Sequence, residues 1–234
     1  PTDGGQSYLE LNPINLWIPR VREIVSYEPT PEEIANGDRK LFLNYKHSFA
    51  YCPWDNQIYS RSWGGIIGKF DPQSRVGRFV IDDGQPEVES YLAFDPLEPH
   101  MMYLCFQHRQ CIYRMDVSKP IKERKLELYA GGINIAGWRD GKRLDAEFNS
   151  PKQIAFNSQG ILFVADRNNH CVRQITRDGM VSTAGGIPGS WGTTNGAPDE
   201  AQFDNPFGIA IDKDDNIIIG EDHSNRMLRK LTLE

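Results

Sequence analysis

The sequence of 234 residues lacks the features that would place it in several common classes. No stretch approaches the roughly 18 consecutive apolar residues of a transmembrane helix, so it predicts no membrane span. Basic residues are in the minority, 26 against 32 acidic ones, and the net charge of −6 argues against nucleic acid as a partner. GxSxG, HExxH, Walker and Rossmann motifs are all absent, so we predict no catalytic residues, no metal and no cofactor.

Cysteine is scarce as well. The four cysteines are Cys52, Cys105, Cys111 and Cys171; they form no CxxC pair, and the histidines do not stand at zinc-ligand spacing. We expect buried free thiols, because cysteine is among the residues most often buried. One disulfide involving Cys105 or Cys111 is the alternative.

Glycine and proline, by contrast, are abundant at 21 and 15 residues, which indicates many tight turns and short strands. A repeat organises these turns. The segment AEFNSPKQIAF (146–156) recurs as AQFDNPFGIAI (201–211), and ILFVADRNNHCVRQIT (161–176) recurs as IIIGEDHSNRMLRKLT (217–232). We align the first pair at an offset of 55 and the second at 56, taking the intervening turn to be one residue longer in the later copy.

This alignment matches acidic and amide residues. Asp166 meets Asp222, and Asn169 meets Asn225. Two weaker copies lie around 91–116 and 49–72, where Phe106 and Arg61 stand in place of the aspartate.

Each copy indicates short antiparallel strands, and four such strands repeated every 45–60 residues predict an all-β propeller. A helical solenoid is excluded because no segment with a period of 3.6 residues recurs. A β-sandwich, which does not repeat its turn chemistry, is the weaker alternative. The predicted blades are 46–82, 90–130, 151–185 and 206–234, and residues 1–45 are predicted to hold strands 3 and 4 of a preceding blade with an insertion.

The turn motifs resemble a known family. Two copies are similar to the NHL repeat: each has PxQIA or PxGIA, then an aliphatic strand, and then ADRNNHCVR or EDHSNRMLR. The most specific part of the similarity is the pattern Asp-x-x-Asn-(His/Arg)-x-apolar-Arg. The stretch GxxDGxxxxAxFxxP (137–151) resembles bacterial proteins that join an Ig-like IPT/TIG module to a six-bladed NHL propeller. The resemblance implies a partial six-bladed disc, a longer parent chain with earlier blades and an Ig-like module, and an extracytoplasmic location.

The acidic hairpins have two interpretations. Asp and Asn side chains commonly set turns by bonding nearby backbone N–H groups, so we expect a structural role for Asp166, Asn169, Asp222 and Asn225. Arg173 and Arg229 on the following strand would neutralise the aspartates. A ligand or metal role is the alternative.

Propeller topology places the hairpins between strands 2 and 3 on the same side as the links from each strand 4 to the next blade. We call this side the loop face. Its candidate binding residues are Trp63, Arg109, Trp138, Arg139, Arg167, His170, Trp191 and His223. Because tryptophan is costly to expose unless a partner covers it, three tryptophans on one face indicate a binding surface.

The sequence therefore favours a non-catalytic binding or scaffolding propeller. Carbohydrate is the favoured ligand, because sugars stack on tryptophan and because the resemblance implies bacterial glycan-utilisation systems. A protein–protein interaction platform is one alternative, and a hydrolase or lyase with its site on the loop face is another.

Overall fold

The computed structural model describes residues 6–10, 20–24, 26–27, 46–62, 64–74, 76–84, 89–222 and 227–232. Three predicted site residues, Trp63, His223 and Asn225, lie outside this part of the chain. Within it, the helical elements are three single turns of 3-10 helix: η1 (Gln107–Arg109), η2 (Ile121–Glu123) and η3 (Arg167–Asn169). None of the described helices is long and apolar enough to cross a membrane.

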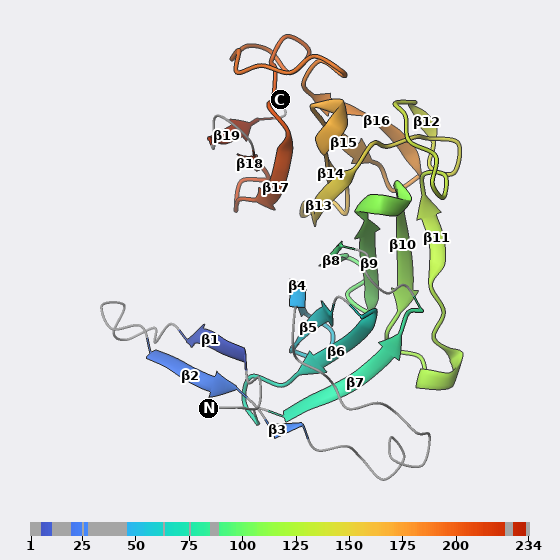
Figure 1. The fold of residues 1–234 in the computed structure, drawn as a ribbon, viewed down its shortest axis with the longest axis vertical. Coiled ribbons are helices and arrows are strands. Elements are labelled where there is room, and N and C mark those ends of the chain that lie inside the picture. Colours follow the sequence, from blue (N-terminus) through green and yellow to red (C-terminus); the bar gives the residue numbers. More distant parts are fainter. Residues whose placement is uncertain are drawn as a thin grey trace.

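Four sheets follow one another along an arc, with β4, β8, β13 and β17 on its inner side (Figure 1). Blade 1 consists of β4 (Lys46–Cys52), β5 (Gln57–Ser62), β6 (Ile66–Phe70) and β7 (Val76–Asp82). Blade 2 consists of β8 (Ser90–Phe94), β9 (Met101–Phe106), β10 (Cys111–Asp116) and β11 (Glu127–Ala130). Blade 3 consists of β13 (Pro151–Phe156), β14 (Leu162–Asp166), β15 (Cys171–Ile175) and β16 (Met180–Gly185). Blade 4 consists, in the described residues, of β17 (Pro206–Ile211), β18 (Ile217–Glu221) and β19 (Leu228–Leu231).

Short additional strands complete two of the sheets. β3 (Ser26–Tyr27) pairs in parallel with β7, and β12 (Gly141–Lys142) pairs with the outer edge of β16. β1 (Gln6–Glu10) and β2 (Arg20–Ile24) form a separate antiparallel hairpin. All pairings inside the four blades are antiparallel, so the predicted all-β propeller fold is confirmed.

The blades pack face to face along the arc. The inner strands make the contacts in order, β4 against β8, β8 against β13 and β13 against β17. One apolar core lies at each of the three junctions, centred on Leu104, Val164 and Ile219. Because a middle strand is covered on both faces, it reads as a continuous apolar run rather than an alternating one, and all five positions of β14 are buried.

All four cysteines are buried and free. Burial raises the pKa of the Cys111 thiol to about 12 and raises those of Cys105 and Cys171 well above the ordinary value. These thiols therefore remain protonated and act as small apolar core residues.

The structure corrects the alignment of the two clearest copies. The turns at 157–161 and 212–216 have the same length, since Asn157 N–H bonds to Ile161 O and Asp212 N–H to Asn216 O. The offset of 55 therefore continues through strand 2. Glu221, not Asp222, lies opposite Pro206, as Asp166 lies opposite Pro151, and the extra residue falls in the hairpin after Glu221.

The junction cores predict a stability difference between buried and exposed apolar side chains. Phe163 is fully buried between blades 3 and 4, so Phe163→Ala should lower the free energy of unfolding by about 3–5 kcal/mol. Ile135→Ala, at an exposed link position, is the control and should change it by less than about 0.5 kcal/mol. Urea unfolding measures both; equal losses would show that blades 3 and 4 do not share a packed core.

Candidate functional site: the loop face of blades 3 and 4

The hairpin after β14 is built around a fully buried carboxylate. Asp166 accepts hydrogen bonds from Asn149 N (2.7 Å), from Asn169 Nδ2 (2.8 Å) and from Arg173 Nη1 (3.3 Å). Burial raises the pKa of Asp166 to about 6, although these three donors favour the ionised form. Each carboxylate oxygen is thus occupied, which is the geometry of a turn-setting residue rather than of a ligand contact.

Arg173 extends this arrangement to the link 131–150, which connects blades 2 and 3. Its fully buried guanidinium donates to Glu147 O and Arg139 O, each at 3.0 Å, and to Asp140 Oδ1 at 2.5 Å. The guanidinium carbon also lies 5.4 Å from the centre of the Phe148 ring. We call Asp166, Arg173 and these link groups the Arg173 clamp. Only a planar group with several fixed donors can serve them together, so lysine is not an equivalent.

Blade 4 repeats the clamp with different residues. Glu221 Oε1 accepts from Asp204 N at 3.1 Å and from Arg229 Nη1 at 3.3 Å. Arg229 in turn donates to Thr194 O (3.0 Å) and Asn195 Oδ1 (2.7 Å) of the link 186–205. The Asp222 carboxylate, which the sequence alignment paired with Asp166, instead lies 3.5 Å from Arg167 Nη2.

Blades 1 and 2 depart from this pattern, and their departures depend on each other. Arg61 forms a fully buried ion pair with Asp83 at 2.5 Å, and its guanidinium lies 5.0 Å from the centre of the Phe106 ring in blade 2. Phe106, at the aspartate position of its own blade, packs edge-on against Tyr113 at 5.4 Å. Blade 2 therefore replaces the ion pair with an aromatic pair that supports the arginine of blade 1.

The predicted basic residues are placed differently from one another. Arg139 is exposed and pairs with Glu147 at 2.6 Å. Arg109 ends η1, and its carbonyl accepts from Asn134 N–H. His170 has a left-handed backbone (φ 55°), and its Nδ1 accepts from Asn205 N at 3.3 Å, so it shapes the turn.

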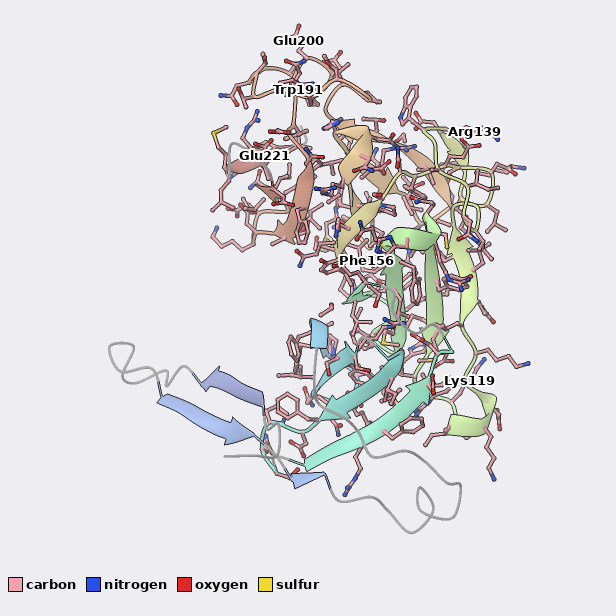
Figure 2. All side chains as sticks on the ribbon, in the orientation of Figure 1. Lys119, Arg139, Phe156, Trp191, Glu200 and Glu221 are labelled. Atoms are coloured by element: carbon pink, nitrogen blue, oxygen red, sulfur yellow. The ribbon has the colours of Figure 1, made fainter. Side chains whose placement is uncertain are left out.

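Two of the predicted tryptophans lie on links that meet at one hairpin. Asn169 Nδ2 donates to Gly137 O at 2.8 Å, while Asn169 O accepts from Gly189 N at 2.9 Å. Trp138 and Trp191 therefore stand on the same side of the sheet. They do not occupy equivalent positions in the two links, because the residue equivalent to Trp191 is Ala136: Trp191 forms a bridge with Phe203, and Ala136 forms the same bridge with Phe148. Figure 2 shows Trp191 and Arg139 toward the outer part of the same end of the arc.

A hollow of about 300 Å³ lies between these two links and β16. Trp138, Asp140 and Asp199 line it together with Pro198 and residues 182–188. The Trp138 side chain is held in place, because its Nε1 donates to Thr183 Oγ1 at 3.2 Å, and yet it is 50% exposed. We call this the Trp138 hollow. Trp191, at 68% exposed, does not line it.

The inner strands carry a polar cluster that the sequence analysis missed. Lys152 Nζ lies 2.5 Å from Glu89 Oε2 and 4.7 Å from the centre of the Phe207 ring, against which Tyr91 packs edge-on. Lys152 falls where the pairing of β13 and β14 shifts register between Pro151 and Ile154, so simple strand alternation did not place it. The one signal in the sequence that could have pointed to Lys152 is its charge within an otherwise apolar strand. In the described residues no group of three or more His, Cys, Asp and Glu side chains is arranged to hold a metal ion.

Comparison with known proteins agrees with this architecture. Residues 148–175 match the model of the NHL repeat, so blade 3 contains an NHL repeat. The structure superposes on an auxiliary nutrient binding protein from Bacteroides thetaiotaomicron with a TM-score of 0.67 and 25% identity, covering 79% of this chain and 47% of that one. It also superposes on a gluconolactonase from Xanthomonas campestris with a TM-score of 0.57 and 13% identity, covering 81% and 59%.

A relative found by sequence covers a smaller part of this chain than these structures do. Over 74 residues the chain is 35% identical to Protein SUPPRESSOR OF QUENCHING 1, chloroplastic, of Arabidopsis thaliana, which is 32% of this chain and 6% of that protein. The chain thus spans about half the length of the Bacteroides structure and a small part of the plant protein. The likeness to the gluconolactonase shows the fold alone.

The Arg173 clamp predicts a graded loss of stability. Arg173→Met leaves Asp166 buried without its cation and should lower the free energy of unfolding by about 3–5 kcal/mol. Arg173→Lys keeps the charge but cannot reach all the link acceptors, so its loss should be intermediate. Arg139→Met removes an exposed cation on the same link and should cost less than about 1 kcal/mol. Urea unfolding of the three variants checks the order; Arg173→Lys matching the unmodified chain would contradict the clamp.

Proposed function

We propose that this chain is a non-catalytic binding propeller that takes a carbohydrate ligand in the Trp138 hollow. The observation that carries the proposal is the half-exposed Trp138 ring, fixed by Thr183 at the edge of a hollow that also contains carboxylates. An exposed tryptophan that is already ordered gives a ligand a flat apolar surface at little cost in conformational entropy.

The other walls suit a sugar. Asp140 and Asp199 offer acceptors for hydroxyl groups. Asp140 Oδ1 accepts a hydrogen bond from Arg173, so this carboxylate is held as a fixed acceptor. A fixed acceptor beside an ordered ring supports a binding role for the Trp138 hollow. An extracytoplasmic location, where a glycan ligand would be met, belongs to the same proposal.

The comparisons are compatible with a binding role. A propeller that shares the fold at 25% identity is an auxiliary nutrient binding protein. The fold by itself does not decide the function, because propellers also host enzymes such as the gluconolactonase.

A protein–protein interaction platform is the second candidate, and one observation favours it. Four apolar side chains are exposed on the two links, and Ile187 also lines the Trp138 hollow: Ile133, Ile135, Leu144 and Ile187. Exposed apolar side chains that gather in one region are typical of protein interfaces.

Substitution of Trp138 tests the carbohydrate proposal. In a calorimetric screen against soluble oligosaccharides, Trp138→Ala should weaken binding of any sugar ligand by about 1–3 kcal/mol, through loss of ring stacking. Trp54→Ala is the matched control, because Trp54 is 48% exposed in the turn between β4 and β5, on the opposite face. It should leave the affinity unchanged.

Two results would count against the proposal. Equal sugar affinity in the unmodified chain and in Trp138→Ala would move the site away from the hollow. A protein partner lost in Trp138→Ala, with no sugar bound by the unmodified chain, would support the interaction platform instead.

A further inference from the structure

The links that enter blades 3 and 4 align without a gap. The segments 131–150 and 186–205 have the same length, and the equivalent bridges described above lie at the same positions in both. At this offset of 55 residues, Asp140–Gly141 of the first link corresponds to Asn195–Gly196 of the second. Blade 4 therefore has a side-chain amide where blade 3 has a carboxylate.

The contacts of the two buried arginines support this correspondence. In blade 3, Arg173 Nη2 donates to a link carbonyl at 3.0 Å and to Asp140 Oδ1 at 2.5 Å. In blade 4, Arg229 Nη2 donates to the equivalent carbonyl, that of Thr194, at 3.0 Å and to Asn195 Oδ1 at 2.7 Å. The same guanidinium nitrogen thus binds the same two positions of each link, once with a charged acceptor and once with a neutral one.

The Asn195–Gly196 pair has the local features that favour spontaneous deamidation, in which the next main-chain nitrogen attacks the side-chain amide. Both residues are exposed and lie outside the strands, and glycine has no Cβ to obstruct the attack. In the described part of the chain the Gly196 N–H forms no backbone hydrogen bond, so it is free to lose its proton. Gly141, by contrast, lies in β12, which pairs with β16.

Arg229 adds an independent contribution. Attack on Asn195 Cγ places negative charge on Oδ1, the atom that accepts from Arg229 Nη2. A fixed cation beside an oxygen that becomes negatively charged lowers the barrier to the attack. The guanidinium stays in place during the reaction, because it is almost fully buried and also donates to Gln202 O and Glu221 Oε1.

We propose that Asn195 is a site of spontaneous deamidation, and that the reaction gives the clamp of blade 4 the carboxylate that blade 3 has by sequence. The main-chain nitrogen of Gly196 loses its proton to a solvent base and bonds to Asn195 Cγ, and the Cγ–Nδ2 bond breaks with release of ammonia. One water molecule then opens the succinimide ring, leaving an aspartate or an isoaspartate at position 195. The aspartate product places a carboxylate against Arg229, as Asp140 lies against Arg173.

Peptide mapping by mass spectrometry after incubation at mildly alkaline pH tests the site, because deamidation adds about 1 Da to the affected peptide. A free peptide with the sequence of residues 192–199 is the reference. We expect position 195 of the folded chain to be converted at least about tenfold faster than Asn157, which precedes a serine and lacks this unobstructed approach. Asn157 Oδ1 also accepts from two backbone N–H groups of its own turn.

Gly196→Ala is the matched variant. Its Cβ would lie 3.2 Å from Oε2 of Glu200, an exposed and flexible side chain, which Figure 2 shows at the outer end of the arc. Gly196 has no left-handed φ that would require glycine, so the fold should be retained, and a thermal melt checks this. The added methyl group should slow conversion at position 195 by about tenfold or more. The other Asn–Gly pair of the sequence, Asn36–Gly37, lies outside the described residues, and its rate should not change.

Asn195→Asp measures the effect of the product on stability. Because an ionised acceptor bonds a guanidinium more strongly than an amide does, the midpoint of urea unfolding should rise above that of the unmodified chain near neutral pH. The rise should shrink as the salt concentration increases. Thr193→Asp is the control, because it adds the same charge to an exposed position of the same link, and its midpoint should not rise.

Three results would overturn the proposal. One is an unchanged position 195 after an incubation that converts the free peptide. Another is equally fast conversion in Gly196→Ala, which would exclude attack by the main-chain nitrogen. The third is a midpoint for Asn195→Asp that is no higher than that of Thr193→Asp, which would show that the clamp of blade 4 gains nothing from a carboxylate.

Discussion

A buried guanidinium near the loop face of three blades is the interaction on which the rest of this structure depends. Arg61, Arg173 and Arg229 each pair with a carboxylate and lie against an aromatic ring. In blades 3 and 4 the same group also holds the link that enters the blade. Because burying a charge is costly unless it is paired and hydrogen-bonded, each arginine is stable only when its whole set of partners is in place.

This constraint explains how a short repeat produces a shaped surface. The links 131–150 and 186–205 contain little regular structure of their own, and backbone acceptors within them are occupied by Arg173 and Arg229. Because both links are held in fixed positions, the Trp138 hollow forms between them. The connection 117–126 between β10 and β11 follows the same principle on the opposite face, with Arg124 as the anchor.

The sequence predicted the parts that depend on periodicity and missed those that depend on register. The repeat predicted an all-β propeller, because apolar strands and turn residues recur at regular intervals. It mispaired Asp222 with Asp166, because the best letter match concealed the true position of Glu221. The sequence analysis missed Lys152 because this residue lies where the pairing of β13 and β14 shifts register. It also missed the Trp138 hollow, because this hollow depends on the conformation of long connections, for which a single sequence carries no periodic signal.

The most direct test of this account is hydrogen exchange in the link 131–150, compared between the unmodified chain and Arg173→Lys under native conditions. If the Arg173 clamp positions the link that carries Trp138, the amides of Gly137 and Glu147, which bond to Phe148 O and Arg139 O, should exchange at least about tenfold faster in the variant. The amides of β9 in blade 2 should be unchanged. Equal exchange of the link in both proteins would contradict the claim that the clamp shapes the loop face.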